Sequence, residues 1–219
     1  MNKKIYCTLD TETVSGASQN EGIYHLGGLI HDRQGNVLAS FNYLIAENFD
    51  KIDQAFYGKK NFGIYQEMIA NGVCSIIPTE RQAVDLVKTI LDYYGVSTMC
   101  AYNSAFDYSK TLCRELVEDR EFIDLWLMTL QTIATKKSFI RFCENNNFIT
   151  KKKSCKTSAE VVYRFLTNNT EFEEEHTAFE DSKIEMQIFL ECLKMHKGFT
   201  RNTHCFDFPN SWSLFTKVA

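Results

Sequence analysis

Residues 3–12 read KKIYCTLDTE, and this stretch decides the fold. Its first seven residues predict a buried strand that stops at Asp10. Side chains two residues apart on a strand point to the same face, so the carboxylates of Asp10 and Glu12 can converge on one ion. The D-x-E pattern recurs at 119–121 inside a charged segment, where a solvated surface explains it. Only the first copy follows an apolar strand, and this makes it the candidate metal site.

The rest of the chain alternates apolar runs with turn and helix signals. Further strands are predicted at residues 23–31, 37–45 and 96–100, and residues 122–127 are predicted to form a further strand or a strand–helix junction. Helices are predicted at residues 79–94, 106–118, 130–146, 157–167 and 180–196. Glycines interrupt the apolar pattern between 46 and 78, so short helices and loops are expected there. Tight hairpins can join the first three strands, and the order of elements therefore predicts an α/β fold with a mixed five-stranded sheet flanked by helices.

The size and charge of the chain limit its function. It has 219 residues, which fits one large domain, and a formal net charge of −4. This charge is not typical of a tight, non-specific nucleic-acid binder. It is still compatible with action on nucleic acid, because bound divalent cations can supply the positive charge where a phosphate sits.

The cysteines and the N-terminus bear on the cellular compartment. Eight cysteines occur without a C-x-x-C pair or zinc-ligand spacing, so reduced and partly buried thiols are expected. Asp10 ends the N-terminal apolar run too early for a signal peptide, and no stretch approaches membrane-spanning length. These features predict a cytoplasmic protein with no membrane partner.

Further acidic residues stand where strands are predicted to end or helices to begin. Asp107 follows the strand at 96–100 and begins a helix, where the helix dipole alone would favour an aspartate. His176 and Asp181 form an H-x4-D spacing, which composition alone gives about a quarter of the time. A solvated loop histidine and a helix N-terminal acid are the simpler explanations. Four carboxylates gathered at one sheet edge would repel each other, and a hard divalent cation such as Mg²⁺ or Mn²⁺ resolves this.

Three segments, LDTETVSG, YNSAFD and HTAFED, resemble the three motifs of the DEDDh family, the DnaQ-like 3′→5′ exonucleases. They occur in the family order and span nearly the whole chain. The matching residues are Asp10, Glu12, Thr13, Asn103, Phe106, Asp107, His176 and Asp181. Two features depart from the family pattern, because the loop after Glu12 is one residue longer and Phe179 replaces an aliphatic residue.

The resemblance implies a ribonuclease-H-like fold. It also implies an enzyme that removes nucleoside 5′-monophosphates from the 3′ end of single-stranded nucleic acid. It implies two Mg²⁺ or Mn²⁺ ions, with the metal ligands Asp10, Glu12, Asp107 and Asp181. His176 is implied as the general base and completes the catalytic set. Substrate-binding roles are expected for Thr13, Asn103 and Phe106, although a phenylalanine in this position is more often a core residue.

The sequence also predicts how the chain divides into domains and leaves several functions open. Residues 1–198 are expected to form the exonuclease domain, and residues 199–219 a C-terminal tail of unknown role. A basic segment could steer a phosphate backbone, although a solvated loop is the simpler explanation. Its lysines are Lys151, Lys152, Lys153 and Lys156. Three other functions stay open: a metal-dependent phosphohydrolase on small nucleotides, a nucleic-acid-binding module on a nuclease fold, and an interaction protein with surface acids. The choice between DNA and RNA and a possible homodimer also stay open.

Overall fold

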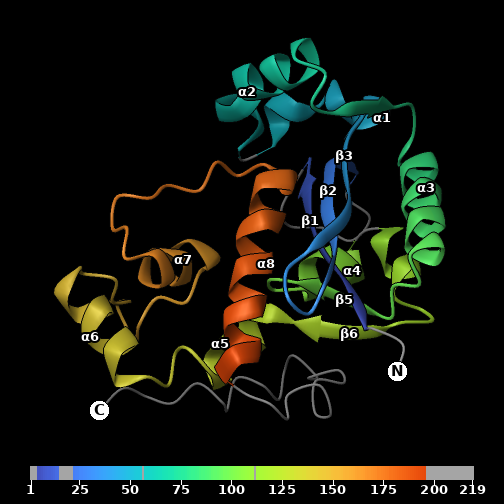
Figure 1. Cartoon of the computed structure of the whole chain (residues 1–219). Coiled ribbons are helices and arrows are strands. Elements are labelled where there is room, and N and C mark those ends of the chain that lie inside the picture. Colours follow the sequence, from blue (N-terminus) through green and yellow to red (C-terminus); the bar gives the residue numbers. More distant parts are fainter. Residues whose placement is uncertain (1–3, 15–21, 56, 111, 196–219) are drawn as a thin grey trace.

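A mixed sheet lies at the centre of the computed structural model, which describes residues 4–14, 22–55, 57–110 and 112–195 (Figure 1). Within those residues, six strands pair in the order β4-β3-β2-β1-β5-β6. Their bounds are Ile5–Thr13 for β1, Ile23–Asp32 for β2, Val37–Ile45 for β3, Ser75–Ile77 for β4, Thr98–Ala101 for β5 and Glu121–Asp124 for β6. Strand β2 runs antiparallel to both β1 and β3, and the other neighbouring strands are parallel.

Helices pack on both faces of this sheet. They are α1 Ala46–Phe49, α2 Gly58–Ala70, α3 Glu80–Tyr93, α4 Ala105–Lys110, α5 Leu125–Gln131, α6 Lys137–Asn145, α7 Ala159–Thr167 and α8 Ala178–Met195. Two short 3₁₀ segments, η1 Ile52–Gln54 and η2 Leu112–Leu116, lie between them. Helix α3 packs on one face, and α8 crosses the other face against β1 and β2, with α5 and α7 beside it (Figure 1).

Strand β1 divides its side chains between the two faces, as its period of two requires. Cys7 and Leu9 belong to the apolar core beneath α3. Tyr6 faces the opposite core, where its ring lies 4.8 Å from the ring of Phe189 of α8, measured between centroids. Asp10 has the same parity as Tyr6, so the strand directs its carboxylate toward the face that α8 covers.

The α/β class and the mixed sheet predicted from the sequence are confirmed. The sequence predicts five strands, whereas the described residues form six, because the short strand β4 pairs with the outer edge of β3. The segment 46–78 also holds the 13-residue helix α2, which continues through Gly63. Tyr65 and Met68 are buried on the inner face of this helix, and their tertiary contacts outweigh the low helix propensity of glycine.

Strand β1 is longer than predicted and does not stop at Asp10. Its pairing with β2 continues, with Asp10 opposite Gly27 and Glu12 opposite His25, and the register shifts only after Glu12. Both carboxylates therefore stand on backbone that is held by strand pairing. The helix predicted at 106–118 is divided into α4 and η2.

The expectations for the cysteines, the C-terminal tail and membrane-spanning segments can be compared with the described residues. Seven cysteines lie among the described residues and all are free thiols, five of them buried. Cys205, the tail at 199–219 and residues 15–21 of the loop after the first motif lie outside the described residues. Within the described part of the chain, no helix is both long and apolar enough to cross a membrane.

Gly27 marks a close approach of α8 to the sheet, because a Cβ atom there would lie 2.4 Å from the backbone nitrogen of Phe179. We expect Gly27→Ala to lower the free energy of unfolding by about 1–3 kcal/mol, since the backbone must shift to admit the methyl group. Thermal unfolding would detect this as a lower Tm, by about 2–4 °C per kcal/mol for a domain of this size.

Gly63→Ala is the matched control for that measurement. Nothing lies within 4 Å of a Cβ atom at Gly63, and alanine favours the helix there. The control should therefore keep or raise the Tm. If Gly27→Ala were as stable as Gly63→Ala, α8 would not rest on β2 in the way described.

Candidate functional site

Three carboxylates converge where β1 meets the first turn of α8. Asp10 and Glu12 come from β1, and Asp181 comes from α8. One carboxylate oxygen from each residue lies within 4.8 Å of the other two. Asp10 and Glu12 are half-buried, and Asp181 is 8% exposed. The predicted convergence of Asp10 and Glu12 is therefore present, and a segment distant in sequence completes the group.

A buried histidine fixes the start of α8 to the sheet. The backbone N–H of Ala178 donates to Nδ1 of His25 at 3.1 Å. Because Nδ1 accepts, Nε2 carries the proton and donates to the side-chain oxygen of Asn42 on β3 at 2.7 Å. Burial lowers the pKa of His25 to about 4, which keeps the ring neutral. His25 is also the strand partner of Glu12, so it sets α8 against the part of β1 that carries the site.

Asp107 contacts β1 through Thr11. Its Oδ1 accepts a 2.6 Å hydrogen bond from the hydroxyl of Thr11, whose side chain points away from the two carboxylates of the strand. The turn before α4 is held by Asp124 at the end of β6, which accepts from the backbone N–H and the hydroxyl of Ser104 at 3.2 and 2.6 Å. The charge of Asp107 acts on Asp10, but Asp107 does not belong to the group whose carboxylate oxygens lie within 4.8 Å of one another.

His176 lies on the loop before α8, and the residues beside its ring are Tyr57 and Glu174, neither of which belongs to the group of three carboxylates. It stacks on Tyr57 with a centroid distance of 3.8 Å and an interplanar angle of 15°. Its Nδ1 lies 3.9 Å from a carboxylate oxygen of Glu174. Burial lowers the pKa of His176, while the charge of Glu160 raises it and that of Lys60 lowers it further. Since Glu174 faces Nδ1, Nε2 is the nitrogen on the other side of the ring.

The acidic residues raise one another's pKa values. For Asp10 the largest cause is burial, followed by the charges of Asp107, Glu185, Asp181 and Glu12. Burial, with Glu12 among the contributing charges, raises the pKa of Asp181 to about 9. Burial also raises the pKa of Glu12 to about 8 and that of Asp107 to about 7. Without a cation, the site therefore holds protons at a pH where ordinary carboxylates are ionised.

Glu185 is a buried carboxylate that the three sequence motifs do not include. It follows Asp181 by four residues on α8, so both side chains lie on the same helix face. It is 3% exposed and accepts a 3.2 Å hydrogen bond from the backbone N–H of Tyr102. Burial, then the charges of Asp107 and Asp181, raise its pKa. The sequence signal that could have identified Glu185 is its position four residues after Asp181 on the predicted helix.

The other residues predicted to bind substrate occupy different environments. Thr13 is buried at the end of β1, and Phe106 is half-buried at the start of α4. Asn103 is exposed with a left-handed φ of +57°, and its carbonyl accepts from the N–H of Phe106 at 2.9 Å. The basic segment 151–156 carries exposed lysines on the connection between α6 and α7. Asn103 and these lysines therefore lie where solvent reaches them.

The three clustered carboxylates fit a hard divalent cation. Among the described residues, Oδ1 of Asp181 is buried and has no hydrogen-bond partner. Oxygen ligands of this kind are those that Mg²⁺ and Mn²⁺ prefer. A buried group of carboxylates also needs compensating charge, which a bound cation provides. Asp10, Glu12 and Asp181 therefore have the chemistry of a metal site.

Removal of divalent cations is expected to make the protein progressively less stable as the pH rises. A carboxyl group whose pKa is raised by folding stabilises the folded state at low pH, and this stabilisation is lost as the pH rises through the folded pKa. The folded pKa values of about 7 for Asp107, 8 for Glu12 and 9 for Asp181 define the upper part of that range.

Thermal unfolding in a chelator, measured from about pH 5 to about pH 9, tests this dependence. The Tm should fall across the range, and excess Mn²⁺ should raise it most at the alkaline end, where the carboxylates are ionised. A Tm that stays constant or rises with pH in the chelator would show that the acidic residues do not repel one another as described.

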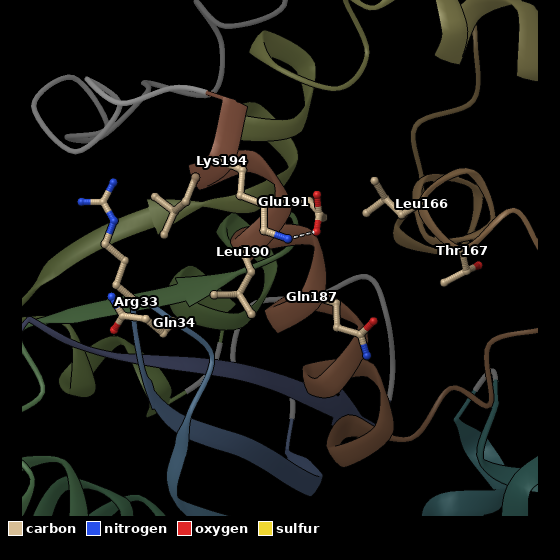
Figure 2. A pocket seen from close by; sticks show the side chains of 9 residues that line it. Arg33, Gln34, Leu166, Thr167, Gln187, Leu190, Glu191 and Lys194 are labelled. Carbon is tan, nitrogen blue, oxygen red and sulfur yellow. Dashed lines mark hydrogen bonds and ion pairs between the residues drawn. The ribbon is translucent and has the colours of Figure 1, made fainter.

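A separate hollow of about 500 Å³ lies toward the other end of α8 (Figure 2). Arg33 and Gln34 of the β2–β3 turn line it together with Leu190 of α8. Glu191 and Lys194 form an ion pair at its edge. None of the three clustered carboxylates lines this hollow, so it is not part of the acidic site.

Comparison with known proteins gives a structural likeness. No protein-family model matches the chain, and no curated protein matches its sequence. The structure of E. coli Exonuclease I in complex with a dA16 oligonucleotide matches with a TM-score of 0.55 and 14% identity, over 89% of this chain and 42% of that chain. A moderately thermophilic Exonuclease I from Methylocaldum szegediense gives 0.58 and 12%, over 90% and 42%. The zinc-bound E. coli ExoI–ssDNA complex gives 0.55 and 14%, over 96% and 43%.

This likeness, at 12 to 14% identity, shows the fold alone. The chain has a ribonuclease-H-like α/β fold, with a mixed sheet flanked by helices as in Exonuclease I. It spans about two-fifths of the length of the Exonuclease I chains that it matches. The fold class implied by the three sequence motifs is therefore confirmed.

Proposed function

We propose that this protein is a divalent-metal-dependent 3′→5′ exonuclease of the DEDDh type, with residues 1–198 as its exonuclease domain. The observation that carries the proposal is the group of Asp10, Glu12 and Asp181, whose carboxylate oxygens lie within 4.8 Å of one another. The group stands on a fold similar to that of Exonuclease I. Order and spacing of the motifs support the same reading, because each supplies a residue at or beside this group.

The acidic residues are proposed to hold the metal. Asp10, Glu12 and Asp181 would bind Mg²⁺ or Mn²⁺, and Asp107 would act on a second ion of the same site. Divalent cations in such a site neutralise the charge of a phosphodiester and lower the pKa of bound water. Strand pairing of β1 and the anchored start of α8 keep the carboxylates in place, so the chain orients its ligands before substrate arrives.

His176 is proposed to accept the proton of the attacking water. Glu174 faces Nδ1 of the ring, and this leaves Nε2 as the atom that takes the proton. The pKa of His176 is lowered by burial, so the ring is neutral and able to accept a proton at neutral pH. Glu174 would then stabilise the charged imidazolium from its other side.

The proposed substrate is single-stranded nucleic acid with a free 3′ end, and the proposed product is a nucleoside 5′-monophosphate. The direction of attack rests on the resemblance to the DEDDh motifs. E. coli Exonuclease I was solved with dA16 and dT13 oligonucleotides, which makes single-stranded DNA the first substrate to test. Thr13, Asn103 and Phe106 are the proposed contacts to the terminal nucleotides.

A series of substrates of different size tests this function against a phosphohydrolase acting on small nucleotides. Metal-free protein would receive Mn²⁺ and then a DNA oligonucleotide, the matching RNA, a dinucleotide or the p-nitrophenyl ester of thymidine 5′-phosphate. Chelator-sensitive release of mononucleotides from an oligonucleotide supports the exonuclease. Hydrolysis of the ester alone supports the phosphohydrolase, and oligonucleotide binding without hydrolysis supports a binding module.

A further inference from the structure

The backbone of His176 adopts an unusual conformation. Its φ is +55°, in the left-handed region that few residues other than glycine occupy. A residue persists in this region only where its surroundings determine its conformation. The contacts around His176 therefore identify what fixes the loop before α8.

Asn61 of α2 holds the backbone of this loop. Its side-chain nitrogen donates to the carbonyl oxygens of Glu175 and His176, each at 2.7 Å. A primary amide carries two N–H bonds, so both of its donors serve the same loop. Asn61 is 1% exposed, and water therefore does not compete for these hydrogen bonds.

Tyr57 holds the ring of the histidine. The two rings are nearly parallel and 3.8 Å apart between centroids, which is a face-to-face stack. Tyr57 precedes Asn61 by four residues at the start of α2, so both side chains reach the loop from the same side of the helix. Burial, followed by the charges of nearby acidic residues with Glu12 first among them, raises the pKa of Tyr57.

Helix α2 is itself attached to the sheet beside the site. Tyr65 is fully buried, and its ring meets those of Tyr24 and His25 edge-on, at 5.8 and 5.2 Å between centroids. The hydroxyl of Tyr24 donates to Glu12 at 3.4 Å. In Figure 1, α2 lies across the end of the sheet at which α8 begins. Helix α2 thus contacts both the histidine loop and β2, whose Tyr24 hydrogen-bonds to Glu12 on the neighbouring strand β1.

We propose that Tyr57 and Asn61 are positioning residues, which hold the imidazole of His176 in the orientation needed for proton transfer. Tyr57 sets the plane of the ring, and Asn61 sets the backbone from which the ring projects. The inference rests on the proposed function and adds two residues from outside the three sequence motifs. It also gives the segment 46–78 a role at the site.

Steady-state kinetics with Mn²⁺ and a 3′-labelled DNA oligonucleotide test the role of the stacked ring. Tyr57→Ala should lower kcat by about 10–100-fold with little change in KM, as supporting residues around a catalytic group do. Tyr57→Phe should keep kcat close to that of the wild type, because it keeps the ring and removes only the hydroxyl. Asn61→Ala should lower kcat in the same way as Tyr57→Ala. Tyr93→Ala is the matched control, since Tyr93 is 83% exposed on α3.

A second measurement needs no hydrolysis. In the metal-free protein, the ring-proton NMR resonances of His176 can be identified by their loss in His176→Ala. Stacking on Tyr57 shifts these resonances upfield, so Tyr57→Ala should move them downfield and Tyr57→Phe should leave them in place. This arm remains informative if the wild-type protein hydrolyses no oligonucleotide, and it therefore separates failure of this inference from failure of the proposed function.

Several outcomes would overturn the inference. In Tyr57→Ala, an unchanged kcat or unmoved His176 resonances would show that the stack does not hold the ring. A loss of kcat in Tyr57→Phe equal to that in Tyr57→Ala would assign the effect to the hydroxyl. A raised KM with an unchanged kcat would make Tyr57 a substrate contact instead of a positioning residue.

Discussion

Asp181→Asn is expected to abolish metal-dependent hydrolysis and leave the fold intact. Loss of one preorganised electrostatic group at an active site costs enzymes about 10²–10³-fold in rate, and we expect at least this from a lost metal ligand. Burial raises the pKa of Asp181 to about 9, so the metal-free residue is largely protonated at neutral pH. Asparagine has the shape and charge of that protonated form, and the Tm in a chelator should therefore be close to that of the wild type.

Metal binding should be affected together with the rate. The rise in Tm that Mn²⁺ causes in the wild type should be reduced or lost in Asp181→Asn, because Asp181 is one of the three clustered carboxylates proposed to bind the cation. Asp119→Asn is the matched control, since Asp119 is exposed and belongs to the second D-x-E pattern at 119–121. Near-normal hydrolysis by Asp181→Asn would be incompatible with the metal site.

His176→Ala is the second substitution with a large expected effect. A positioned general base contributes about 10²–10⁴-fold to rate, so most of the activity should be lost. The affinity for Mn²⁺ should be retained, because the ring of His176 lies beside Tyr57 and Glu174 and is not one of the three clustered carboxylates proposed to bind the ion. Hydrolysis rates and a Mn²⁺ titration followed by Tm measure the two effects separately.

The two measurements distinguish a base from a ligand. If Mn²⁺ affinity fell in His176→Ala as it should in Asp181→Asn, His176 would be a metal ligand. If both the rate and the affinity were unchanged, the histidine would have no part in the reaction. The pH dependence gives a further check, because the wild-type rate should decline as the pH falls through the pKa of His176, which burial lowers.

The part of the site that local patterns determine could be predicted from the sequence. The period of a strand places Asp10 and Glu12 on one face, and this required no knowledge of the tertiary structure. The order of the three motifs supplied Asp181, which belongs to a distant helix. The mixed sheet also followed from local signals, because the hairpin turn and the alternation of strands and helices are visible in the sequence.

The residues that act through tertiary contacts were not visible in the same way. Tyr57 and Asn61 belong to a segment without a clear apolar period, and their partners lie far away in the sequence. Glu185 carries an i,i+4 relation to Asp181, but an isolated helix gives no reason to bury a second acid. Strand β4 is only three residues long, and pairing with β3 defines it more than its own composition does.

The most direct test of the central claim is a time course on one single-stranded DNA oligonucleotide, labelled at its 3′ end in one sample and at its 5′ end in another. With Mn²⁺, we predict that the 3′ label appears at once as a nucleoside 5′-monophosphate, while the 5′ label stays on a strand that shortens one nucleotide at a time. A chelator should stop both changes. Internal fragments at the earliest times, release of the 5′ label first, or hydrolysis that persists in the chelator would contradict a metal-dependent 3′→5′ exonuclease.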